Sequence, residues 1–254
     1  MYIIKNEYEN KGTKYRIRNL NFANLSELID CGWKFVTESH NGDGFEFISK
    51  YDDKIGTLVY HDQNNPNVGY RIYSDYADYL YTYYDDYMVV SKLQEKQKDI
   101  KLLEFPTGII TVGDKVIGQE MPFYEGYKEL GYALYHNQTK EVITFYYLRV
   151  IEILKELLQN GIYYLDVHSG NFLINTINDD IKVIDFERQC LEIEPNNRLK
   201  EVAYDRMINN LKIMINKLNK LRNVFLSGDF VNAKTLEDIE KCVLESHQVL
   251  IKRK

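Results

Sequence analysis

The chain has 254 residues, of which 44% are hydrophobic and 28% charged, and its formal net charge at pH 7 is −6. This apolar content is sufficient for a large hydrophobic core and argues against global disorder. The acidic balance disfavours a dedicated nucleic-acid binder, because contacts to a phosphate backbone need positive charge.

Cysteine usage and the N-terminus indicate the compartment. Cys31, Cys190 and Cys242 lie far apart, which argues against a disulfide framework or a zinc site and favours a reducing environment. The N-terminus becomes charged within five residues, and no apolar stretch approaches the ~18–20 residues that cross a bilayer. We therefore expect a soluble cytoplasmic protein without a membrane partner.

The first half of the chain is predicted to consist mainly of strands. Runs rich in aromatic and β-branched residues alternate with turn-forming Asn, Asp and Gly, which is typical of an antiparallel meander. A short helix over 24–29 and a longer polar helix over 79–100 interrupt these runs. The predicted strands cover residues 2–8, 13–18, 45–50, 56–61, 68–73, 109–112 and 115–119.

The second half is predicted to be mainly helical. Residues at helical spacing between 142 and 157, all but one of them apolar or aromatic, form one stripe, consisting of Val142, Phe145, Tyr146, Arg149, Val150, Ile153, Leu154 and Leu157. Gly161 is a suitable helix stop. Short strands are expected over 172–175 and 182–184, and Thr235 with Asp238 resembles a capping box. The pattern predicts an α+β protein with a β-rich part over 1–121, a hinge over 122–126 and a helical part over 127–254.

One polar loop contains the candidate catalytic and metal-binding residues. Asp166, His168 and Asn171 follow the long predicted helix, and an apolar hairpin then returns the chain to Asp185. Two carboxylates and one amide would converge at one loop edge. These hard oxygen donors suit Mg²⁺, which takes one or two carboxylates and leaves positions for water and phosphate.

This stretch resembles the catalytic and metal loops of the protein-kinase-like superfamily. The form Asp-x-His-x-x-Asn, with an Asp-Phe-Glu whose Asp stands fourteen residues after the Asn, looks most like the branch that contains aminoglycoside and choline kinases. Many bacterial kinase-like proteins share this form. The resemblance covers about residues 45–190. It implies a two-lobed fold, with an antiparallel-sheet N-lobe, a mainly helical C-lobe and an active site in the cleft between them.

The resemblance implies roles for the loop residues. Asp166 matches the catalytic base that orients and deprotonates the acceptor hydroxyl. Asn171 and Asp185 match the Mg²⁺ ligands that bridge the phosphates. His168 stands where protein kinases usually carry a lysine near the γ-phosphate. These roles agree with phosphoryl transfer, which depends on positioning and charge neutralisation.

The resemblance also implies a nucleotide site in the N-lobe. Met121 matches the gatekeeper, and the carbonyl of Pro122 and the amide of Tyr124 would face the adenine edge. Arg71 replaces the lysine that grips the α- and β-phosphates, which changes the geometry because arginine is bulkier and binds bidentately. Glu95 matches its ion-pair partner, unless Arg71 is simply a strand residue.

The glycine loop and the segment after Asp185 depart from the family pattern. Strand counting puts the phosphate-covering loop at 51–56 with Gly56 alone, and the alternative pair is Gly42 and Gly44. Leu165 replaces the usual Arg before the catalytic Asp, and no Ala-Pro-Glu follows the metal motif. The peptide-docking platform of eukaryotic-type protein kinases is therefore expected to be missing.

These observations predict an ATP-dependent, Mg²⁺-dependent phosphotransferase. Its acceptor is a hydroxyl of an unknown small molecule or protein, and His168 and the short segment after Asp185 favour the small molecule. The first alternative is a catalytically weak or inactive pseudokinase that binds nucleotide or a partner. The second keeps the fold but transfers AMP to protein. Dedicated nucleic-acid binding is not expected, because the eight tyrosines between residues 70 and 87 stand among acidic residues and suit packing better than base stacking.

Overall fold

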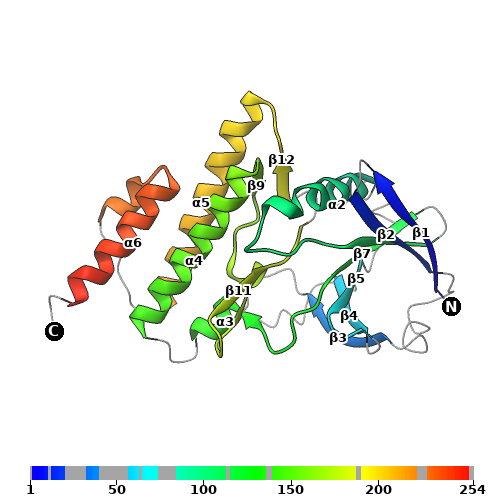
Figure 1. Ribbon diagram of the computed structural model, residues 1–254. Coiled ribbons are helices and arrows are strands. Elements are labelled where there is room, and N and C mark those ends of the chain that lie inside the picture. Colours follow the sequence, from blue (N-terminus) through cyan, green and yellow to red (C-terminus); the bar gives the residue numbers. More distant parts are fainter. Residues whose placement is uncertain are drawn as a thin grey trace, which may run out of the picture. The chain divides into compact units, whose positions relative to one another are not determined.

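The computed structural model describes residues 2–10, 13–20, 33–39, 57–62, 65–73, 84–112, 115–135, 139–186, 190–221 and 228–251. The architecture is α+β, with helices and mainly antiparallel sheets (Figure 1). The chain divides into two units. Unit 1 comprises Met1–Glu125 and Phe186–Arg188, and unit 2 comprises Gly126–Asp185 and Gln189–Lys254. The division after Glu125 lies within the segment predicted as a hinge, and the hinge itself stays a prediction.

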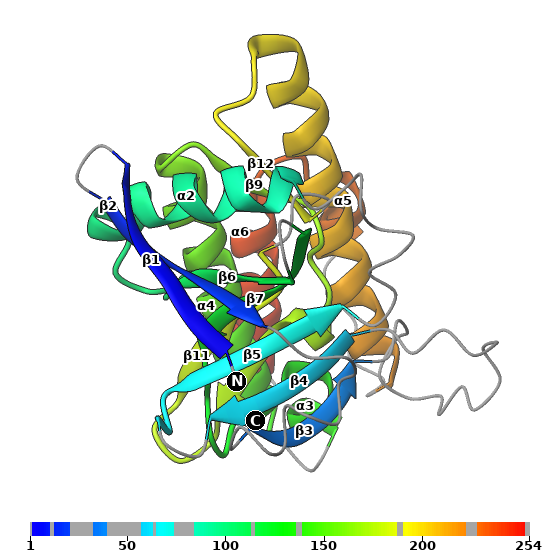
Figure 2. The same ribbon diagram turned by 90° about the vertical axis from the view of Figure 1, so that its right-hand side faces the viewer.

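The described strands of unit 1 form one seven-stranded sheet in the order β1-β2-β6-β7-β5-β4-β3. Figure 2 shows β3, β4 and β5 side by side as an antiparallel meander. The sheet is not wholly antiparallel as predicted, because β2 and β6 pair in parallel. A parallel pair needs a long crossover, which the chain between these strands supplies. The bounds are β1 (Tyr2–Asn10), β2 (Thr13–Leu20), β3 (Trp33–Ser39), β4 (Thr57–Asp62), β5 (Val68–Tyr73), β6 (Gly108–Val112) and β7 (Lys115–Pro122).

Six of these strands overlap predicted runs, and β3 was missed. The expected strand over 45–50 and helix over 24–29 lie outside the described residues. The predicted helix over 79–100 is too long at its C-terminal end: α2 (Tyr84–Lys96) gives way to the 3-10 helix η1 (Gln97–Asp99). The Gln97 side chain explains this end. Its Nε2 donates to the carbonyls of Ile100 and Leu103, and its Oε1 accepts from the Phe105 N–H, so it braces an irregular segment.

The core of unit 1 combines apolar residues with a paired polar group. Val90, Leu93 and Phe105 are almost fully buried, and Phe186 packs edge-on against Phe105 with ring centroids 4.9 Å apart. The buried Tyr70 hydroxyl donates to Asp62 Oδ2 at 2.7 Å. Because buried polar groups are costly without partners, this hydrogen bond allows a tyrosine to fill the core.

Unit 2 is built around helices and two small sheets. Its helices are α3 (Leu130–Tyr135), α4 (Lys140–Gln159), α5 (Asn197–Leu221) and α6 (Leu236–Ile251). Its strands are β8 (Lys128–Glu129), β10 (Phe172–Asn175) and β11 (Asp180–Val183) in one sheet, and β9 (Ile162–Tyr164) with β12 (Leu191–Ile193) in another.

The buried face of α4 differs from the predicted stripe. Val142 and Arg149 are half-buried and Phe145 is exposed, whereas Ile143, Tyr147 and Ile151 are buried in addition to the remaining predicted positions. The reason is that α4 packs against α6 as well as against β9 (Figure 1), so its buried face is wider than one stripe.

Polar contacts join the three long helices. The Tyr147 hydroxyl of α4 donates to Asn219 Oδ1 of α5 at 2.9 Å, and Lys155 of α4 pairs with Glu240 of α6 at 2.7 Å. The predicted capping box of α6 is confirmed. The Asp238 N–H donates to Thr235 Oγ1, and the Thr235 N–H donates to Asp238 Oδ2, both at 3.1 Å. Within the described ranges, no helix combines the length and apolarity needed to span a membrane.

Candidate functional site

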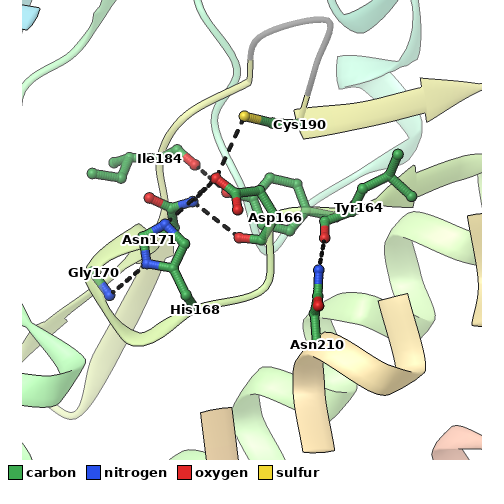
Figure 3. A network of polar contacts seen from close by, with 9 residues as sticks. Tyr164, Asp166, His168, Gly170, Asn171, Ile184, Cys190 and Asn210 are labelled. Atoms are coloured by element: carbon green, nitrogen blue, oxygen red, sulfur yellow. Dashed lines mark hydrogen bonds and ion pairs between the residues drawn. The ribbon is translucent and has the colours of Figure 1, made fainter. Parts of the chain in front are cut away.

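The polar loop of unit 2 begins where α4 ends. Gly161 has a φ of +73°, a left-handed conformation that glycine adopts without strain, and β9 then leads into the loop. The backbone N–H groups of Leu165 and Asp166 both donate to the Cys190 carbonyl, at 2.7 and 3.3 Å. Asn210 of α5 donates to the Leu165 carbonyl at 2.6 Å (Figure 3). Segments distant in sequence therefore fix the backbone that carries Asp166.

The two carboxylate oxygens of Asp166 have different surroundings. Oδ2 accepts a hydrogen bond from Asn171 Nδ2 at 3.0 Å and from Cys190 Sγ at 3.6 Å, and it lies 3.4 Å from His168 Nε2 (Figure 3). No donor in the described part of the chain bonds to Oδ1. The side chain is 41% exposed. One carboxylate oxygen is thus held in place, while no described residue donates a hydrogen bond to the other.

These contacts keep Asp166 ionised. The hydrogen bond from His168 lowers the pKa of Asp166 below its usual value, and contacts from Asn171 and Cys190 act in the same direction against the opposing effect of burial. The Gly170 N–H donates to His168 Nδ1 at 3.2 Å. Since Nδ1 accepts, neutral His168 carries its proton on Nε2, the nitrogen that faces Asp166.

Asn171 connects Asp166 to the end of β11. It is 3% exposed, and its Nδ2 donates to both the carbonyl and Oδ2 of Asp166, each at 3.0 Å. Both hydrogen bonds of this side chain use Nδ2, which leaves Oδ1 as a candidate metal ligand. The Ile184 N–H donates to the Asn171 carbonyl at 3.0 Å, and the Ile184 carbonyl accepts from the Tyr164 hydroxyl at 2.7 Å.

Asp185 follows Ile184 with an unusual backbone. Its φ of 67° lies in the left-handed region, which costs a non-glycine residue energy on the order of 1 kcal/mol or more. Such strain persists only where the surroundings enforce it, and it concentrates at functional sites. Asp166, His168 and Asn171 form one cluster of polar contacts. Asp185 directly follows Ile184, whose backbone N–H donates to the carbonyl of Asn171 in this cluster.

The oxygen atoms of this loop and of Asp185 are of the kind that Mg²⁺ prefers. Among the residues that the structure describes, no group of three or more His, Cys, Asp or Glu side chains could hold a metal ion. Mg²⁺ needs no such group, because one or two protein oxygens are enough when phosphate and water complete the octahedron. Asn171 Oδ1 and the Asp185 carboxylate are the candidate ligands.

The nucleotide-site residues predicted from the resemblance lie in unit 1. Arg71 is 7% exposed on β5, where it stands opposite Gln119 of β7. Met121 and Pro122 lie at the end of β7, opposite Gly69 and Val68. Because side chains alternate along a strand, Arg71 and Met121 share one face of the sheet. Their nucleotide contacts stay predictions.

Three further residues, Tyr124, Gly56 and Glu95, were predicted for the nucleotide site. Tyr124 is half-buried just beyond β7, and Gly56 falls outside the described residues. Glu95 lies in the last turn of α2. No ion pair joins Glu95 to Arg71, although the structure describes both residues. The expected pair is therefore not formed.

Sequence reasoning missed three residues that support the loop, namely Tyr164, Cys190 and Asn210. No motif marks them, since their roles come from contacts between distant segments. A comparison with protein-family models found no match for this chain, and no curated protein matches it significantly.

Proposed function

We propose that the protein is a phosphotransferase with a two-lobed, protein-kinase-like fold that moves the γ-phosphate of Mg²⁺-ATP to a hydroxyl group. The observation that carries the proposal is the asymmetry of Asp166. One carboxylate oxygen is held by Asn171, His168 and Cys190, and the other is available. A general base needs this combination of fixed position and free basic atom.

The residues of the loop have separate roles in the proposed transfer. Asp166 Oδ1 accepts the proton of the acceptor hydroxyl, and its lowered pKa keeps it ionised for that purpose. Asn171 holds Asp166 through Nδ2, and its Oδ1 would hold Mg²⁺ together with the Asp185 carboxylate. The ion would supply positive charge against the phosphates.

The resemblance assigns nucleotide binding to unit 1. Arg71 binds the α- and β-phosphates, and Met121, Pro122 and Tyr124 contact the base, with Gly56 in the covering loop. The acceptor is a small molecule or a protein. His168 and the short segment after Asp185 favour a small molecule, since that short segment leaves no peptide-docking platform.

Isotope transfer tests this proposal. The protein is incubated with γ-labelled Mg²⁺-ATP and a host extract, and label is followed in macromolecular and small-molecule fractions. Asp166→Asn keeps the side-chain shape but removes the base, so transfer falls by about 100-fold or more. Asp238→Asn in the α6 cap is the matched control and retains transfer. Equal transfer by the protein and Asp166→Asn contradicts the assigned role.

A non-catalytic nucleotide-binding module is the second candidate. The absence of an ion pair between Arg71 and Glu95 in the described structure favours it, because active protein kinases need the corresponding lysine–glutamate pair in place. This candidate predicts nucleotide binding without turnover. Turnover that Asp185→Ala abolishes rules it out.

A further inference from the structure

The His168 side chain folds back onto its own loop. It caps the 3-10 helix η2 (Ser169–Asn171), because its Nδ1 accepts the Gly170 N–H at 3.2 Å. The other ring nitrogen, Nε2, lies 3.4 Å from Asp166 Oδ2. Figure 3 shows the imidazole linked to both partners. Both of its nitrogens are therefore engaged within the loop.

The close approach of this imidazole requires a glycine at position 170. A Cβ atom on Gly170 would lie 3.2 Å from both Cε1 and Nδ1 of His168. This distance is shorter than an ordinary van der Waals contact. The φ of Gly170 is not in the left-handed region, so its backbone is open to other residues. Glycine is therefore needed here to leave room for the ring and not for the backbone conformation.

The hydrogen bond from Gly170 also fixes the proton of the neutral imidazole. Because Nδ1 accepts, Nε2 carries the proton and directs it at Asp166. A neutral histidine that contacted the γ-phosphate would have to offer an N–H to it, and the single ring N–H of His168 already faces Asp166. The contacts in the loop therefore differ from the phosphate contact that the resemblance implies for this position.

We propose that His168 is a positioning residue for Asp166, and that Gly170 makes this role possible. A donor on Oδ2 limits rotation of the carboxylate, so Oδ1 keeps a fixed direction. A general base gains from this restraint, because its basic atom must lie within hydrogen-bond distance of the proton that it takes. The inference rests on the proposed phosphotransfer.

Three variants separate positioning from capping. His168→Asn keeps an oxygen that can cap η2, since Asn is a preferred N-cap residue, but its side chain is shorter and loses the contact with Asp166. Gly170→Ala keeps the imidazole and displaces it. The third variant combines both changes. Thr139→Ala is the control, because it removes the hydroxyl that caps α4 away from the loop.

The rate of label transfer from γ-labelled Mg²⁺-ATP in the host extract is measured against ATP concentration. We expect His168→Asn to lower the maximal rate about tenfold, the worth of one hydrogen bond to a charged group, at an unchanged half-saturating ATP concentration. Gly170→Ala lowers it by a similar factor. The double variant is no slower than either single variant, because both changes remove the same contact. Thr139→Ala transfers at the unaltered rate.

Nitrogen NMR of the protein without ATP tests the contact independently of any reaction. At about pH 8, where histidine is ordinarily neutral, the ring signals of His168 should show the proton on Nε2. Their absence from the spectrum of His168→Asn identifies them. In Gly170→Ala the two neutral forms should mix, because Nδ1 loses its donor.

Three results overturn the inference, and they differ from failure of the proposed function. A proton on Nδ1 of His168 excludes the contact with Asp166. An unchanged maximal rate in His168→Asn makes His168 a cap only. A higher half-saturating ATP concentration at an unchanged maximal rate makes it a phosphate ligand. If the unaltered protein transfers no label, the proposed function fails first and the inference falls with it.

Discussion

The polar loop of unit 2 and the sheet of unit 1 each contain a buried amide side chain, and the two side chains differ in their hydrogen bonding. In the loop, Asn171 uses Nδ2 for two hydrogen bonds within its own chain. In the sheet, Nε2 of the equally buried Gln119 has no partner among the described residues. The first amide is therefore fixed within its own chain, whereas the second keeps a buried donor that no described residue satisfies.

Replacing both amides by apolar side chains of similar volume tests whether they differ in structural role. Asn171→Leu leaves Asp166 without its fixed partner, so we expect the free energy of unfolding to fall by about 2–3 kcal/mol. Gln119→Met should change it by less than about 1 kcal/mol, because no hydrogen bond is lost. Denaturant unfolding of both variants measures the contrast. Equal losses would mean that the two amides have the same structural role.

A second variant tests how far the preorganised loop depends on distant support. Asn210→Leu removes the donor to the Leu165 carbonyl, and we expect it to cost about 1–2 kcal/mol of unfolding free energy. It should also lower kcat for phosphotransfer while leaving ATP affinity unchanged. Asn209→Leu, an exposed neighbour on the same helix, is the matched control. A loss of ATP affinity in Asn210→Leu alone would contradict the separation of roles.

Some features of the fold and of the polar loop can be predicted from the sequence. Spacing alone predicts that Asp166 and Asn171 meet, because both lie in one short loop between a helix and a hairpin. Alternation predicts most strands of the sheet, and the capping box of α6 is local. Each of these features depends on residues close together along the chain.

The missed features depend on register and tertiary contact. The sequence predicts only that Gln119 lies in a strand. The pairing of β5 with β7 is what places it opposite Arg71. The parallel pairing of β2 with β6 likewise joins segments about 90 residues apart. Asn210 supports the polar loop from α5, a helix that begins about 25 residues after that loop in the sequence. None of these contacts leaves a local signal.

A helix cap in unit 2 provides a reference outside both polar sites. Thr235→Ala removes the hydroxyl that accepts from the Asp238 N–H, so the free energy of unfolding should fall by about 1 kcal/mol. Phosphotransfer and ATP affinity should stay unchanged. Chemical denaturation and initial-rate assays test this. A change in kcat comparable to that of Asn210→Leu would show that general destabilisation, and not loop support, controls the rate.

The smallest expected effect is the pH dependence of the Asp166 contacts. Because the folded-state pKa of Asp166 is lowered, its stabilising contribution is complete above the unfolded value of about 3.9 and is lost as pH falls through the folded value. The side chain is 41% exposed, so screening keeps the effect below about 1 kcal/mol. The difference in unfolding free energy between the protein and Asp166→Asn should therefore be constant from pH 5 to 7 and should shrink at more acidic pH. Gln119→Met, which removes no titrating group, should show no such change relative to the unaltered protein. A difference that grows on acidification would mean that Asp166 is destabilised, and not held, by its neighbours.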